Sequence, residues 1–172
     1  MNDAGSRPLL MWALDLFAST PATLRALLGT LPEDAVSTPG AEGWSAKDVV
    51  AHLISLHGPT LVDRITLLLE QDEPSIASVD EATVLEASGL RARPLDDLLA
   101  QFARNRAEAV SWLRGMSDEQ LRRVGIHSVA GRVTVADLIH HKAWHDLLHV
   151  EQVCQILAAP LDERRGAMRV FR

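Results

Sequence analysis

Three things are scarce in this sequence of 172 residues: cysteine, long apolar runs and excess positive charge. The single cysteine, Cys154, excludes a framework of intramolecular disulfides. No window approaches the roughly 18 consecutive apolar residues that a membrane-spanning helix needs, so we expect no membrane partner. The formal net charge is −6 and the arginines are scattered. Because a phosphate backbone is bound by a basic stripe, we also expect no nucleic-acid partner.

What is present is an ordinary globular composition, with 47% hydrophobic and 23% charged residues. A chain of this length can bury a substantial core, so we expect a single domain over residues 1–172, located in the cytoplasm. The apolar stretch "PLLMWALDLFAS" could suggest a signal peptide, but Asp15 interrupts it and its apolar residues follow helical spacing. That pattern favours a core helix.

Four segments carry apolar residues at helical spacing, over about 8–28, 45–69, 94–113 and 134–158. Pro21 predicts a kink or split in the first, because proline removes a backbone donor and clashes with the preceding turn. Gly58-Pro59 predicts a bend in the second, and Pro160 the end of the fourth.

Two of these helices begin at capping boxes, formed by Ser45 with Asp48 and by Thr134 with Asp137. The acidic connection 72–90 suggests a helical turn around 80–87, and "RRVGIHSVAGRVTV" suggests a loop or a small extended excursion rather than a sheet. Four amphipathic helices without a competing strand signal predict an all-α fold, an antiparallel four-helix bundle. Such bundles build metal sites from side chains on facing helices.

The stretch "HHKAWHDLLHVEQV" holds four of the seven histidines. At about 100° per residue, His145 and His149 lie about 40° apart and one turn apart, close enough to chelate one ion. His141 lies another 40° back and Gln152 belongs to the same polar stripe, while His140 points away. Either this polar stripe is solvated, or it faces the core, where unpaired polar atoms are costly and a cation would satisfy several.

His52 offers a third ligand, because it lies on the apolar run of the second helix. A lone histidine there would be a core residue, but beside an HxxxH pair on another helix it becomes a candidate ligand. Three imidazoles with a free coordination position are typical of a catalytic site, and Zn²⁺ or Ni²⁺ suits neutral imidazole. The helical faces alone leave His141 open as an alternative ligand.

Other residues near this stretch have simpler interpretations. "HDLLH" resembles the HExxH protease helix, but Asp146 is shorter than glutamate and no third ligand follows, so we interpret Asp146 as solvent-facing or salt-bridging. Cys154 lies about 180° around the helix from His145, as a small buried hydrophobe. We expect His57 to be exposed or to have a local structural role.

Three further residues lie where they could border the site. His127, in the loop before the fourth helix, could reach its mouth. Trp44 and Trp144 are most simply packing residues, and their proximity to the candidate ligands would let either one wall a substrate pocket.

Two motifs resemble those of a known family. "GWSAKDVVAHLISLH" resembles the W-[ST]-x₆-HL segment, and "TVADLIHHKAWHDLLHVEQV" the H-x₃-H-x₂-Q helix, of the DinB/YfiT-like superfamily. The likeness extends in order over nearly the whole chain. It implies a four-helix bundle, often dimeric, in which His52, His145 and His149 bind a divalent metal and Gln152 follows. His141 then becomes a neighbour of the ligands or a pocket residue.

The resemblance also implies a range of activities. Members include enzymes that use bacillithiol or mycothiol for S-transfer or for isomerisation of maleylpyruvate, and many members have no assigned reaction. Our leading hypothesis is a metal-dependent enzyme for a small-molecule substrate, with a thiol cofactor or water at the open position. The alternatives are a metal-dependent hydrolase, a non-enzymatic metal- or ligand-binding bundle of the stress response, and a structural bundle without metal. The resemblance also implies that the chain can form a homodimer.

Overall fold

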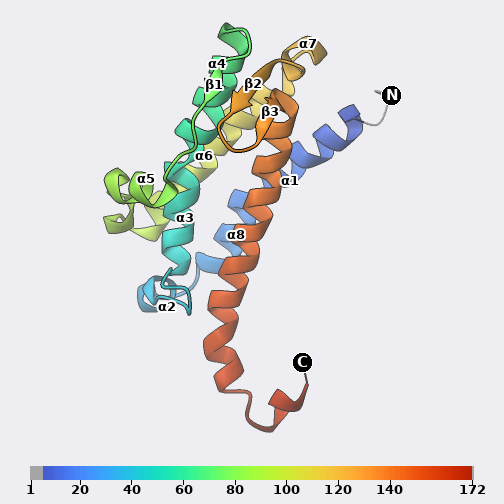
Figure 1. Ribbon diagram of the computed structural model, residues 1–172. Helices are drawn as coiled ribbons and strands as arrows, with labels where there is room; N and C mark the ends of the chain where they lie inside the picture. The colour runs from blue at the N-terminus through green and yellow to red at the C-terminus, as the bar shows by residue number, and fades with distance from the viewer. Residues whose placement is uncertain (1–5, 172) are drawn as a thin grey trace.

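The computed structural model describes residues 6–171 of the chain. Four long helical rods form the bundle (Figure 1), which confirms the predicted four-helix fold. The rods are α1 (Ser6–Leu28), α3 (Ala46–Ser55) continued by a π-helical turn (Gly58–Val62) and α4 (Asp63–Glu70), α6 (Leu95–Arg114) and α8 (Val135–Glu163). Shorter elements connect them: α2 (Glu33–Ser37), α5 (Glu81–Ser88), α7 (Asp118–Leu121) and a 3₁₀ turn at Leu90–Ala92, and a 3₁₀ turn at Gly166–Val170 follows α8.

The rods follow an unusual order of directions. Both α1 and α3 pack against α6 and α8. One hydrophobic cluster joins the start of α1, the end of α4, the end of α6 and the start of α8, and a second cluster joins the opposite ends. Therefore α1 and α8 run one way while α3–α4 and α6 run the other (Figure 1). The α1–α6 and α3–α8 pairs are antiparallel, as predicted, and the α1–α8 and α3–α6 pairs are parallel.

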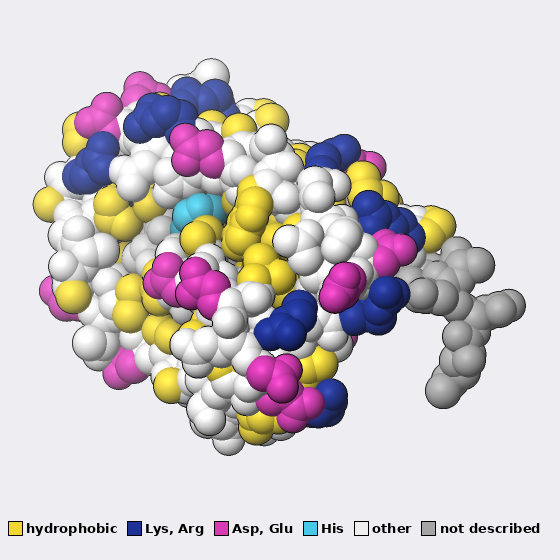
Figure 2. Space-filling model, turned by 90° about the horizontal axis from the view of Figure 1, so that it is seen from above, with side chains coloured by type: hydrophobic (Ala, Val, Ile, Leu, Met, Phe, Trp, Pro, Cys, Tyr) yellow, Lys and Arg dark blue, Asp and Glu magenta, His cyan; other side chains and the backbone are white. Residues whose placement is uncertain are grey.

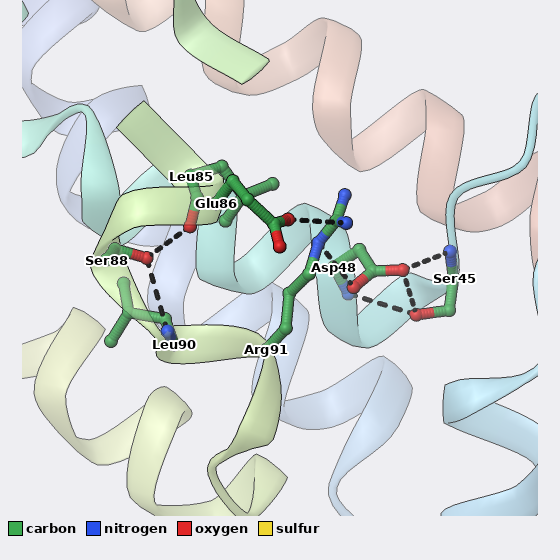
Figure 3. Close-up of polar contacts among 7 residues, drawn as sticks. All are labelled: Ser45, Asp48, Leu85, Glu86, Ser88, Leu90 and Arg91. Carbon is green, nitrogen blue, oxygen red and sulfur yellow. Dashed lines mark hydrogen bonds and ion pairs between the residues drawn. The ribbon is translucent and has the colours of Figure 1, made fainter. Parts of the chain in front are cut away.

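Both predicted capping boxes are present, at Ser45 with Asp48 and at Thr134 with Asp137. Asp48 has a second partner, because Arg91 Nε lies 3.3 Å from its carboxylate and Arg91 Nη1 lies 3.4 Å from Glu86 (Figure 3). Arg91 therefore ties the segment that includes α5 to the first turn of α3. This contact and the cap define where the helix that carries His52 begins.

The prolines behave differently from one another. The second rod changes to a π-helical turn at Gly58-Pro59, as predicted. However, α1 continues unbroken through Pro21, and α8 continues through Pro160 to Glu163, so the predicted end of α8 before Pro160 is wrong. Within a helix, proline removes one hydrogen bond, and near the exposed end of α8 the loss of that single bond does not stop the last turn.

The segment predicted as a loop or a small extended excursion rather than a sheet does form a sheet, so that part of the prediction is wrong: residues 124–134 form a hairpin. β2 (Val124–His127) pairs antiparallel with β3 (Gly131–Thr134), and β1 (Ser75–Ile76) pairs parallel with β2. The turn needs Gly131, whose φ is +74°. At Gly125 a Cβ atom would lie 2.8 Å from side-chain carbons of both Ile76 and Leu68, so glycine permits the close approach that allows pairing. The helix expected near 80–87 is confirmed as α5.

Charges of both signs are distributed over the end of the bundle seen in Figure 2. Lys and Arg side chains alternate there with Asp and Glu side chains around apolar patches.

Among residues 6–171, no helix is both long enough and apolar enough to cross a membrane.

Candidate metal centre

The three histidines predicted as ligands come together between α3 and α8. One ring nitrogen from each of His52, His145 and His149 lies within 4.8 Å of the other two. The ring centroids of His145 and His149 are 4.4 Å apart, and those of His52 and His149 are 4.7 Å apart. Because α3 and α8 pack side by side, residues about ninety positions apart meet in one cluster.

His52 lies deepest, with 1% of its surface exposed. Neither ring nitrogen has a hydrogen-bond partner, and Trp44 packs edge-on at 5.0 Å between ring centroids. Burial, followed by electrostatic repulsion from the His149 and Lys142 side chains, lowers the pKa of His52 to about 3. The ring is therefore neutral near pH 7, with a lone pair free to bind a cation.

His145 and His149 direct their Nε2 atoms at each other, 3.2 Å apart. His149 Nδ1 lies 2.8 Å from Gln152 Oε1 and donates to it, so Nε2 is the ring nitrogen that faces the cluster. His145 Nδ1 is buried without a partner, and burial lowers the pKa of this ring to about 2, with the charge of Lys142 the next cause. Three imidazole rings at this spacing, of which those of His52 and His145 are neutral and carry unpartnered nitrogens, fit a divalent ion such as Zn²⁺ or Ni²⁺.

The other polar residues of this region lie around the cluster. His141 stands outside the ligand group, with its ring centroid 6.0 Å from that of His145 and 5.6 Å from that of Trp144. Trp144 is 55% exposed, so Trp44 is the tryptophan that packs on the cluster. His127 Nδ1 accepts hydrogen bonds from two amides of the hairpin turn, each at 3.2 Å.

Asp146 is not solvent-facing, as one of its two interpretations had it, but is 2% exposed and forms an ion pair with Arg106. Arg106 is not among the residues predicted from the sequence. The available signal was its position on the apolar stripe of α6, where Phe102 and Val110 lie one turn to either side. His57 is half-buried beside this pair rather than exposed, and burial lowers its pKa.

Two further observations concern the edge of the cluster. Glu81, which the sequence analysis also missed, places Oε2 at 3.6 Å from His52 Nε2, beyond hydrogen-bond distance. An open groove of about 290 Å³ begins at His145 and His149 and is lined also by Gln152.

Cys154 is exposed, so its interpretation as a buried hydrophobe is wrong; the residue lies on a part of α8 that the other rods do not cover.

The fold and the site together define a four-helix bundle with a three-histidine cluster of the metal-binding kind. A family model described as the DinB superfamily matches residues 16–153, and the chain belongs to that superfamily. A curated relative from Oceanobacillus iheyensis, provisionally named a metal-dependent hydrolase, is 25% identical over 116 residues, which are 66% of this chain and 66% of the relative.

A solved structure has the same fold. It is YfiT from Bacillus subtilis, described as "a probable metal-dependent hydrolase with an unusual four-helix bundle topology", with a TM-score of 0.78 and 20% identity. The match covers 94% of this chain and 90% of YfiT. The mixed parallel and antiparallel packing described above is therefore shared with a protein of low sequence identity.

Proposed function

We propose that this protein is a divalent-metal-dependent hydrolase of small molecules, with its metal bound by His52, His145 and His149. The observation that carries the proposal is the cluster of three imidazoles beside an open groove, in which both ring nitrogens of His52 and Nδ1 of His145 lack hydrogen-bond partners. The names of the two similar proteins, both metal-dependent hydrolases, support the reaction class. A bound divalent metal would act as a Lewis acid and lower the pKa of a water molecule or thiol that it coordinates.

The surrounding residues take distinct parts in this proposal. Gln152 accepts the Nδ1 proton of His149 and so holds that ring with Nε2 toward the cluster. The Trp44 ring covers one side of the His52 ring. Glu81 is the carboxylate beside His52 Nε2, and it does not belong to the ligand group itself. We assign it the role of accepting a proton from the attacking nucleophile.

The assignment of Glu81 has its own test. In Glu81→Gln the side chain keeps its size but loses its charge, so kcat should fall by about 10²- to 10⁴-fold while metal content is unchanged. Glu86→Gln, on the same helix but paired with Arg91, is the matched control and should leave kcat unchanged. Loss of metal in Glu81→Gln would instead make Glu81 a ligand.

The reaction class is tested by turnover on two kinds of substrate. Purified protein loaded with Zn²⁺ or Ni²⁺ is assayed on a panel of small esters and amides, and separately on a generic electrophile with bacillithiol, mycothiol or glutathione. We expect hydrolysis that a chelator removes and added metal restores. Metal-dependent thiol transfer without hydrolysis would make the protein a thiol-dependent transferase. Stoichiometric metal binding without turnover in either assay would leave a metal-binding bundle.

A further inference from the structure

A buried ion pair lies directly behind the proposed metal centre. Arg106 from α6 pairs with Asp146 from α8, and the two residues are 3% and 2% exposed. The same Arg106 Nη1 donates to the Phe17 carbonyl of α1 at 2.5 Å. The guanidinium also stacks on aromatic rings, with Cζ 3.3 Å from the ring centroid of Phe17 and 4.6 Å from that of Phe102. One side chain therefore joins α1, α6 and α8.

Pro21 explains why the Phe17 carbonyl is available. In a regular helix the amide of residue 21 would donate to the carbonyl of residue 17, but proline has no amide hydrogen. Pro21 lies inside the continuous helix α1, so the Phe17 carbonyl would be an unpaired acceptor without Arg106. The proline in α1 and the arginine in α6 thus complement each other.

The rings of His145 and His149 differ in what surrounds them. A metal-binding histidine usually donates its second ring nitrogen to a nearby acceptor, which fixes the ring. His149 has such an acceptor in Gln152, whereas His145 Nδ1 has none. The space that His145, Asp146 and Arg106 line together is only about 10 Å³, about enough for one water molecule. The ring of His145 is thus held by packing against its surroundings.

We infer that Arg106 and Asp146 are positioning residues of the metal centre: their ion pair sets the rotation of α8 at His145, so that this ring faces His52 and His149. The inference rests on the proposed metal site. Each residue along a helix turns the side chain by about 100°, so a small rotation of α8 at Asp146 displaces the neighbouring His145. Stability alone does not account for the pair, because apolar side chains often replace a buried ion pair at no loss of stability.

The test separates metal affinity from folding. The double variant Arg106→Met/Asp146→Leu removes both charges and fills the space with apolar side chains. We expect it to fold, with a thermal midpoint of the metal-free protein near that of the wild type, because removal of two buried charges offsets the cost of leaving the Phe17 carbonyl unpaired. Its affinity for Co²⁺ and Zn²⁺, measured by competition with a chromophoric chelator, should fall by about 10- to 100-fold. The visible absorption spectrum of the Co²⁺-loaded form should also change.

The control removes an ion pair elsewhere between two of the same helices. Arg114 and Asp15 join α6 to α1 at the surface by an ion pair that includes no residue of α8. The double variant Arg114→Gln/Asp15→Asn should therefore keep the wild-type metal affinity and Co²⁺ spectrum. If it lost affinity to the same extent, the effect would belong to the α1–α6 contact in general, and the inference would be overturned.

The remaining outcomes are also decisive. A folded Arg106→Met/Asp146→Leu protein with wild-type affinity and an unchanged Co²⁺ spectrum would overturn the inference and leave the metal site standing. If that variant does not fold, Arg106→Lys serves instead, because it keeps a positive charge opposite Asp146 but lacks the planar fork. We expect weakened affinity in Arg106→Lys, and unchanged affinity would refute the inference. A wild-type protein that binds no metal would overturn the proposed function together with the inference.

Discussion

His145 and His149 lie one turn apart on the same helix, yet the protein holds them by different means. His149 lies at the groove and donates to Gln152, three residues further along α8. His145 has no such acceptor and packs on the side where Arg106 and Asp146 form their buried ion pair. The comparison teaches that one candidate ligand is oriented within its own helix and the other by contacts from α1 and α6.

The largest expected effect is the loss of metal when either histidine is removed. His145→Ala and His149→Ala should each lower metal affinity by at least about 100-fold, because three ligands become two. His141→Ala, one turn before His145 on the same helix, is the control and should retain about one metal ion per chain by elemental analysis. Stoichiometric metal in the His145→Ala and His149→Ala proteins would show that the pair does not bind the ion.

The next effect is on folding stability, which should differ between changes beside His145 and beside His149. Arg106→Met alone leaves the Asp146 carboxylate buried without a partner, which should lower the free energy of unfolding by about 3–5 kcal/mol in urea denaturation. Gln152→Leu, which changes a residue at the groove, should alter the free energy of unfolding by less than about 1 kcal/mol. If the two substitutions lowered the free energy of unfolding equally, the proposed difference between the buried ion pair beside His145 and the groove residue beside His149 would be contradicted.

A smaller effect follows from pH. The pKa of His52 in the folded chain is lowered to about 3, whereas an unfolded histidine titrates near 6.5. The unfolded chain therefore binds the extra proton first, and the metal-free protein loses stability as the pH falls from about 6.5 toward 3. At pH 5 the loss attributable to His52 is about 2 kcal/mol. Urea denaturation at pH 7 and pH 5 measures it, and His52→Asn should show a correspondingly smaller difference between the two pH values.

The smallest effect concerns the hydrogen bond that orients His149. Gln152→Leu removes the acceptor of the Nδ1 proton, so metal affinity should fall by about 10-fold, or about 1.4 kcal/mol. Gln155→Leu, in the next part of the same groove, removes only a hydrogen bond to Glu151 and should leave affinity unchanged. If Gln152→Leu also bound metal like the wild type, His149 would need no hydrogen-bonded support.

The sequence predicted those features that depend on residues close to one another along the chain. The capping boxes at Ser45 and Thr134 are confirmed, because each needs only a partner three residues away. The helical spacing of His145 and His149, with His52 on a second apolar helix, indicated the three rings that lie together, with His141 as a further candidate. The family resemblance then removed His141 as the alternative.

The features that the sequence analysis missed depend on distant contacts. The partners of Arg106 lie on α1 and α8. The sequence of α6 therefore gives no indication of them beyond the presence of an arginine on an apolar stripe. The hairpin at residues 124–134 depends on Gly125 fitting against Ile76 and Leu68 and on pairing with β1, about fifty residues earlier. Short, glycine-broken segments of this kind gain their strand structure from neighbours that periodicity does not reveal.

The arrangement of the rods has a consequence for the order of events on the ribosome. The first rod, α1, packs mainly against α6 and α8, not against α3, which is synthesised next. A nascent chain that has emerged only through α3 thus holds two apolar rods without their main lateral partners, and even after α6 the bundle lacks its closing helix. The emergence of α8 completes the hydrophobic clusters and also brings His145 and His149 to His52. Both the core and the candidate metal centre must therefore wait for α8 during synthesis, and until then the apolar faces of the earlier rods remain open to chaperones.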